Sequence, residues 1–247
     1  MFSILVSLIT LIGVCTGTAA GMALRKSLPE GHLTGDSRDA IKLGAGLIAT
    51  MTALLLSLLI ASAKSFYDSQ NTELIDMCAK TIVLDRMLAL YGPESKLART
   101  MLLDRVNQML LVIDGKTDHA AAENTRGERI YESVQRLQPT SDSQRTLQSQ
   151  ALNIVVDLAK TRWLMSAQLG SFASLPLLVT VISWLVLIFA SFGLFAPVNR
   201  TVLAAFALSA LSVTGAIFLM LEMYAPFHGM VKLSSLPLHQ TVERLGK

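Results

Sequence analysis

Residues 41–63 read IKLGAGLIATMTALLLSLLIASA, and this stretch decides the fold of the chain. It is about as long as the ~20 residues that a helix needs to cross a ~30 Å hydrocarbon core. Three more apolar stretches of similar length accompany it: Phe2 to Leu24, Phe172 to Phe195 and Val202 to Leu221. The sequence therefore predicts an all-α, polytopic membrane protein with four transmembrane helices in a two-plus-two arrangement.

Charged residues are almost excluded from these four stretches. The four stretches contain no Asp, Glu, Arg or His, and their single lysine is Lys42, at the edge of the second stretch. Ion-coupled pumps carry such groups inside the membrane to relay protons or bind ions. Their absence disfavours a pump.

The charges gather between the second and third stretches. Residues 64–171 hold 13 Lys and Arg and 13 Asp and Glu, and the remaining segments give the chain its net charge of +3. Helix-period apolar positions recur in this neutral segment, and no helix-breaking residue separates the second stretch from Gly92 and Pro93. We expect a solvated helical domain between spans two and three, and four parts in all: 1–63 (spans one and two), 64–171 (soluble helices), 172–222 (spans three and four) and 223–247 (a corner and tail).

Small residues form stripes in the first two spans. Gly13, Gly17 and Gly21 recur every four residues, which lets another helix approach closely, and we expect helix packing there. In the second span a small, mildly polar stripe lies opposite the bulkier Ile48, Leu55 and Leu59, and such a stripe is able to line a narrow pore or to form a packing groove. Its members are Gly46, Thr50, Ala53, Ser57 and Ala61. Lys42 and Lys64 flank it, one at each end, as candidate pore-mouth charges.

Binding and catalytic motifs are weak. Asp114, Asp118, His119 and Glu123 have ligand-type atoms, but they lie in a polar turn without a cysteine or second histidine, so we expect no metal and no cofactor. No nucleophile elbow, phosphate-binding glycine loop or paired-histidine motif is present, so we expect no enzyme activity. The excess of basic residues lies at the membrane borders and termini, where it suits lipid head groups, so we expect no nucleic acid partner.

The end of the fourth span predicts a structural corner made by Glu222, Pro226, Phe227 and Gly229. The proline stops the helix and the glycine permits a turn, so Phe227 is able to fold back under the bundle. A carboxylate at this depth is expected to reach interfacial water or to pair with a basic group.

Several short segments of the sequence resemble those of a family of bacterial membrane proteins described as bestrophin-like. They are DAIKLGAGLIAT at 39–50, ASAKS at 61–65, LDR at 84–86, YGPE at 91–94, PFHG at 226–229 and SSLPL at 234–238. The match extends over nearly the whole chain.

This resemblance implies a distant relation to bestrophins, which are homopentameric anion channels with four membrane helices per subunit and a helical cytosolic region between spans two and three. In those channels aromatic side chains narrow the pore, whereas residues 41–63 contain none. The positive charges that flank the spans do not fix the orientation of the chain in the membrane. The resemblance implies a bacterial inner membrane location with both termini and the central domain in the cytoplasm.

We therefore expect a homo-oligomeric channel, a pentamer by analogy, that is embedded in membrane lipid and passively conducts small inorganic anions through a pore, with the second span toward the axis. The alternative is a non-conducting membrane scaffold that recruits a partner through its cytosolic helices.

Overall fold

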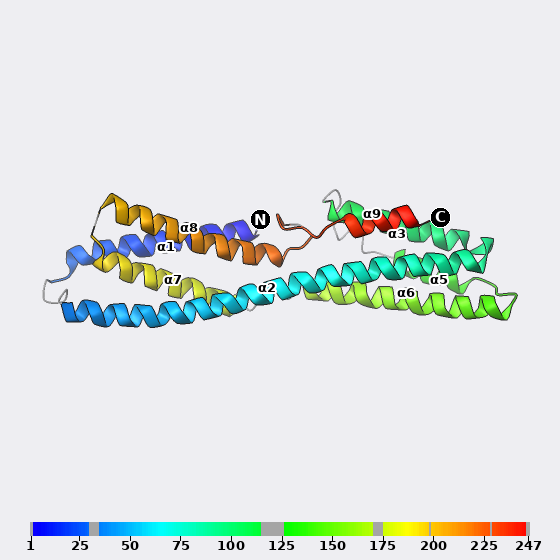
Figure 1. Cartoon of the computed structure of the whole chain (residues 1–247), viewed down its shortest axis with the longest axis horizontal. Coiled ribbons are helices and arrows are strands. Elements are labelled where there is room, and N and C mark those ends of the chain that lie inside the picture. The colour runs from blue at the N-terminus through cyan, green and yellow to red at the C-terminus, as the bar shows by residue number, and fades with distance from the viewer. Residues whose placement is uncertain are drawn as a thin grey trace. The chain divides into compact units, whose positions relative to one another are not determined.

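The computed structural model describes residues 2–29, 35–114, 126–169, 175–197, 199–227 and 229–245, and every element in these ranges is helical (Figure 1). The predicted all-helical class is thus confirmed for the described residues. The elements are α1 (Phe2–Ser27), α2 (Gly35–Tyr91), the 3₁₀ turn η2 (Pro93–Ser95), α3 (Lys96–Ile113), α5 (Arg126–Gln135), α6 (Asp142–Leu169), α7 (Leu175–Phe195), α8 (Arg200–Met223) and α9 (Leu236–Arg244).

Four of these helices, α1, α2, α7 and α8, are long and apolar enough to cross a membrane. α2 has 57 residues and is therefore about 85 Å long at the ~1.5 Å rise per residue of an α-helix. Only its apolar residues 41–63 are needed to cross the bilayer, and the helix continues without a break to Tyr91, as its lack of breakers predicts.

The chain divides into two compact units. Unit 1 comprises Met1–Phe66 and Phe172–Tyr224, and unit 2 comprises Tyr67–Ser171 and Ala225–Lys247. Within unit 1, α1 packs on α7 and α8, and a buried cluster that includes Val14, Val181 and Ile217 lies between the helices. α8 begins at an N-cap, since the Asn199 side chain accepts a hydrogen bond of 2.9 Å from the Val202 amide.

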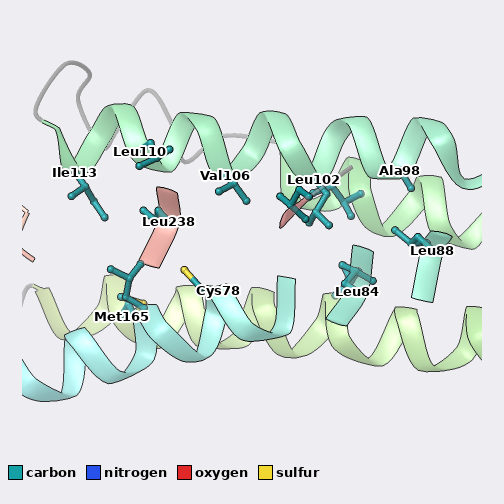
Figure 2. Packing of buried hydrophobic residues seen from close by; sticks show 14 of the residues in the cluster. Cys78, Leu84, Leu88, Ala98, Leu102, Val106, Leu110, Ile113, Met165 and Leu238 are labelled. Atoms are coloured by element: carbon teal, nitrogen blue, oxygen red, sulfur yellow. The ribbon is translucent and has the colours of Figure 1, made fainter. Parts of the chain in front are cut away.

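Unit 2 has its own hydrophobic core (Figure 2). Leu84 and Leu88 of α2 face Ala98 and Leu102 of α3, and Leu238 of α9 reaches the same cluster. All are at most 3% exposed. Burial of each leucine side chain stabilises by roughly 1.5–3 kcal/mol relative to exposure, so this cluster holds the helices of unit 2 together.

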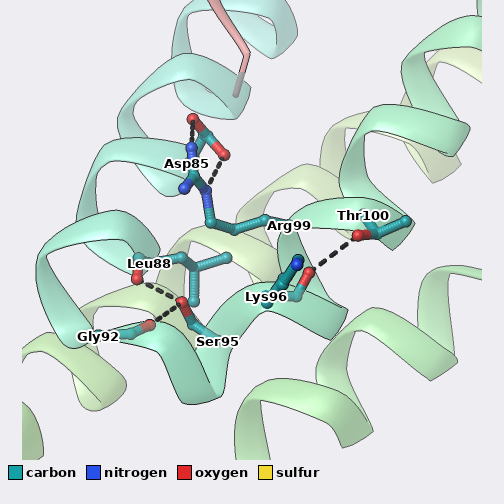
Figure 3. A network of polar contacts seen from close by, with 7 residues as sticks. All are labelled: Asp85, Leu88, Gly92, Ser95, Lys96, Arg99 and Thr100. Atoms are coloured by element: carbon teal, nitrogen blue, oxygen red, sulfur yellow. Dashed lines mark hydrogen bonds and ion pairs between the residues drawn. The ribbon is translucent and has the colours of Figure 1, made fainter. Parts of the chain in front are cut away.

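The turn from α2 to α3 is fixed by polar contacts (Figure 3). Gly92 adopts φ +129°, which a residue with a side chain rarely adopts, so the glycine permits the chain to reverse here. The Ser95 hydroxyl binds the carbonyl oxygens of Leu88 and Gly92. One turn further, Arg99 donates from Nε to Asp85 Oδ1 at 2.7 Å and from Nη2 to Oδ2 at 3.0 Å. This bidentate bond raises the pKa of Arg99, against the opposing effect of burial.

Candidate functional site

The membrane part of α2 presents one packed face. Ala45, Thr52, Leu59 and Ala63 are buried within unit 1, at 6%, 3%, 3% and 0% exposed. Their spacing of seven, seven and four residues places them on one side of the helix. Thr52 satisfies its hydroxyl by donating to the Ile48 carbonyl at 2.7 Å, so a polar side chain is tolerated on this face.

The small stripe lies away from that packed face. Successive residues turn by about 100° around an α-helix, which places the stripe on average about 140° from the buried positions. All five of its members are exposed in the single chain: Gly46, Thr50, Ala53, Ser57 and Ala61. A row of larger side chains lies beside it and is exposed as well: Leu43, Leu47, Met51, Leu54 and Leu58. The single chain thus leaves both faces for lipid or another molecule to cover.

The hydroxyl hydrogens of the stripe point back to the helix. Thr50 donates to the Gly46 carbonyl at 2.6 Å, and Ser57 donates to the Ala53 carbonyl at 2.8 Å. The hydroxyl oxygens keep lone pairs on the exposed side, and rotation of either hydroxyl would free a donor at the loss of one hydrogen bond. A Cβ on Gly46 would meet no atom within 4 Å, so the stripe is open at this end.

Two lysines flank the stripe. Lys42 and Lys64 are both exposed, and they are 22 positions apart, which corresponds to about 33 Å along the helix, close to the thickness of a hydrocarbon core. Lys42 lies 3.5 Å from Asp39, with both side chains more than half exposed, so this ion pair leaves the ammonium group accessible to water.

The three glycines of α1 lie against α7. A Cβ on Gly17 would lie 2.8 Å from the Val186 carbonyl oxygen, and one on Gly21 would overlap the Ala190 carbonyl. A Cβ on Gly13 would be 3.3 Å from the Val186 side chain. The backbones of the two helices therefore approach closely along this line, a geometry that supports the packing role proposed for these glycines.

The residues of the expected corner belong to both units. In unit 1, Glu222 is 4% exposed and accepts a hydrogen bond of 2.6 Å from the Ser3 hydroxyl of α1. In unit 2, Pro226 and Phe227 are buried, and Phe227 belongs to the core cluster. The Leu233 amide donates to the Pro226 carbonyl and the Gly229 amide to the Ala225 carbonyl, each at 2.9 Å. His228 lies outside the described residues.

With this geometry in place, comparison with known proteins identifies the family. A family model described as the bestrophin-like domain matches residues 12–238. The chain belongs to the bestrophin-like family. No curated protein and no solved structure matches the chain.

Metal ligation has no support in the described part of this bestrophin-like chain. No group of three His, Cys, Asp or Glu side chains is gathered in the described ranges. Of the four donor-type residues noted in the sequence, Asp114 is described and is the C-cap of α3, whereas Asp118, His119 and Glu123 lie outside the described residues.

Several contacts of this bestrophin-like chain are not predicted by its sequence. Gly193 of α7 meets the Thr18 carbonyl, so the close approach to α1 uses a glycine from each helix. Local patterns predicted neither Ser3 as the partner of Glu222 nor the helix α9. The spacing of Leu238, Thr241 and Leu245 is helical and could have indicated α9, whereas nothing local links Ser3 to Glu222.

Proposed function

We propose that this bestrophin-like chain assembles as a homo-oligomeric ring, a pentamer by family analogy, and that the ring conducts small inorganic anions passively. The observation that carries the proposal is the exposure of the small stripe of α2, on the side of the helix away from its packed face. In the ring this stripe would face a shared axis. The family relation is consistent with a channel-like function.

Conduction without energy coupling follows from the chemistry of the stripe. Residues 43–63 contain no titratable acidic or basic side chain that could bind and release a proton during a transport cycle. Small side chains and two hydroxyls would form a weakly polar constriction, which gates by wetting and dewetting.

The preference for anions is assigned to the lysines. The stripe itself offers hydroxyl oxygens outward while its hydrogens are bonded to the helix, so it does not by itself favour anions. A ring of Lys42 side chains at one mouth and of Lys64 side chains at the other would raise the local anion concentration. Replacing both lysines by glutamine should therefore lower selectivity for anions over cations while conduction persists.

We place the protein in the bacterial inner membrane, with both termini and the helices of residues 64–171 in the cytoplasm. This orientation rests on the family relation. Lipid would then cover the large apolar side chains that α1, α7 and α8 expose, among them Leu5, Val179 and Leu208.

Chloride release from liposomes tests this function. Liposomes that contain purified protein should release chloride faster than empty ones, and the mass of the detergent-solubilised particle should be that of several chains. A monomeric particle would contradict the ring. Equal release rates, with an oligomeric particle, would instead favour a non-conducting scaffold that recruits a partner through its soluble helices.

A further inference from the structure

A cavity of about 360 Å³ lies inside unit 2, between α2, α3, α5, α6 and α9. Its volume is near the lower end of the ~300–1,000 Å³ typical of small-molecule sites. Its lining extends from Leu102 to Ile113 on α3 and from Val155 to Ser166 on α6. On each helix these end residues are 11 positions apart, which corresponds to about 16 Å. The cavity is therefore elongated along the helices.

The walls of this cavity are mainly apolar (Figure 2). Cys78 of α2, Ile113 of α3, Met165 of α6 and Leu238 of α9 line it from different helices. Each of these four residues is at most 6% exposed, so a molecule placed here would be shielded from water over most of its surface. Leu102 and Val106 of α3 are one helical turn apart and add to the same wall.

The polar residues of the lining are already engaged. The Thr241 hydroxyl donates to the Pro237 carbonyl at 2.8 Å, and Arg105 and Ser166 each have an interaction within the structure. Some buried side-chain nitrogen and oxygen atoms of the described residues lack a hydrogen-bond partner, but none of them belongs to the lining. A charged or strongly polar ligand would therefore lose its hydrogen bonds to water without gaining equivalent ones from these side chains. The lining favours an uncharged, apolar ligand.

We propose that this cavity binds a single uncharged hydrocarbon chain, which comes either from a free apolar molecule or from the acyl chain of a lipid. The chain would lie along α3 and α6 and would gain van der Waals contacts with the surrounding helices that an empty space does not provide. A bound chain would thus complete the hydrophobic core of unit 2. This site is independent of ion conduction and would exist in a scaffold as well.

Two buried valines test whether the space is free. Val106 lines the cavity and is 6% exposed, whereas Val134 of α5 is 0% exposed and does not line it. Val106→Phe should place its ring in the cavity and change the thermal midpoint of the full chain in lipid nanodiscs by less than about 2 °C. Val134→Phe should lower the midpoint by about 4 °C or more, because a closely packed core has no room for the ring. Equal losses in the two variants would show that no free space lies beside Val106, and would overturn the proposal.

Photolabelling of the full chain in phosphatidylcholine nanodiscs then tests the chemistry of the ligand. One probe is dodecane with a diazirine in the middle of the chain, and its charged analogue carries a trimethylammonium group at each end. Mass spectrometry of peptides measures the label on the lining residues of α3 and α6. The neutral probe should label them about tenfold more than the charged probe or better, since the cavity offers no partner for a buried charge. Equal labelling by the two probes would contradict an apolar site.

A third probe distinguishes the two sources of the chain. It is a phosphatidylcholine with a diazirine near the end of one acyl chain, incorporated into the same nanodiscs. Label from this lipid on the lining residues would assign the site to a lipid acyl chain, and label from the dodecane probe alone would assign it to a free apolar molecule. Val106→Phe should abolish either label, because its ring occupies the cavity. Absence of label from both neutral probes, or equal labelling of the folded Val106→Phe protein, would overturn the proposal.

Discussion

At the scale of single residues, a mostly buried ion pair joins two helices of unit 2, between Asp85 of α2 and Arg99 of α3. The Asp85 side chain is 3% exposed and the Arg99 side chain 26% exposed, so most of the pair is removed from water. A buried carboxylate is costly unless it is paired and hydrogen-bonded, and the bidentate geometry supplies both (Figure 3). The pair therefore fixes α3 against α2 at the turn.

Arg99→Gln should destabilise unit 2 by about 2 kcal/mol, because Asp85 would lose two charge-assisted hydrogen bonds. The thermal midpoint measured by far-UV circular dichroism should fall by about 4–8 °C. Adding Asp85→Asn should recover part of the loss, since the buried charge is then removed.

Arg145→Gln is the control for that substitution. Arg145 lies 3.6 Å from Asp142, with side chains 73% and 99% exposed, so its loss should leave the midpoint unchanged. Equal midpoints for the Arg99 and Arg145 variants would show that the buried pair does not stabilise the fold.

Contacts of this kind could not be predicted from the sequence. Asp85 and Arg99 are two charges among many in a neutral segment, and they meet only because the chain reverses at Gly92. Glu222 and Ser3 are 219 residues apart, and the sequence offered only interfacial water or a basic group as partners for the carboxylate. Local patterns do not determine which distant polar groups meet.

At the scale of helices, the sequence was more informative. Apolar runs of the length of a bilayer predict the spans, and the absence of a breaker before Gly92 and Pro93 predicts the long extension of α2. Periodicity also separates the large side chains of α2 from the small stripe. It does not say what covers each face, since a small stripe serves equally well for packing and for lining a pore.

Alanine is expected to have opposite effects at a packed glycine of α1 and at an open glycine of α2. Gly17→Ala should lower stability by about 1–3 kcal/mol, because the new methyl group would meet the Val186 carbonyl oxygen at 2.8 Å. Gly44→Ala, where a Cβ meets nothing within 4 Å, should raise it by about 0.5–1 kcal/mol through helix propensity. Thermal melts of the detergent-solubilised variants measure both, and a more stable Gly17→Ala protein would argue against close packing.

The stripe of α2 predicts a steric effect on conduction. Ser57→Ala should conduct chloride as the parent does, whereas Ser57→Trp should reduce release to that of empty liposomes because the indole ring would fill a narrow lumen. Leu54→Trp, on the neighbouring large-residue face where Leu54 is 70% exposed, should still conduct. A Ser57→Trp protein that assembles normally and conducts unchanged would remove α2 from the pore.

At the scale of the whole molecule, the central claim is that several copies enclose a pore lined by the small stripe of α2. The stripe lies on one helix of each chain, so a lumen lined by it on all sides requires the same helix from several copies. The family relation is consistent with a channel, and the exposure of the stripe leaves it available to face an axis.

Cysteine labelling during chloride release is the most direct test of this claim. Ser57→Cys and Leu58→Cys, each placed in a chain with Cys15→Ala and Cys78→Ala, differ by about 100° around the helix. After reconstitution, a negatively charged methanethiosulfonate should block chloride release through the Ser57→Cys protein and leave release through the Leu58→Cys protein unchanged. Undiminished chloride release from a Ser57→Cys protein that mass spectrometry shows to be fully labelled would contradict the account.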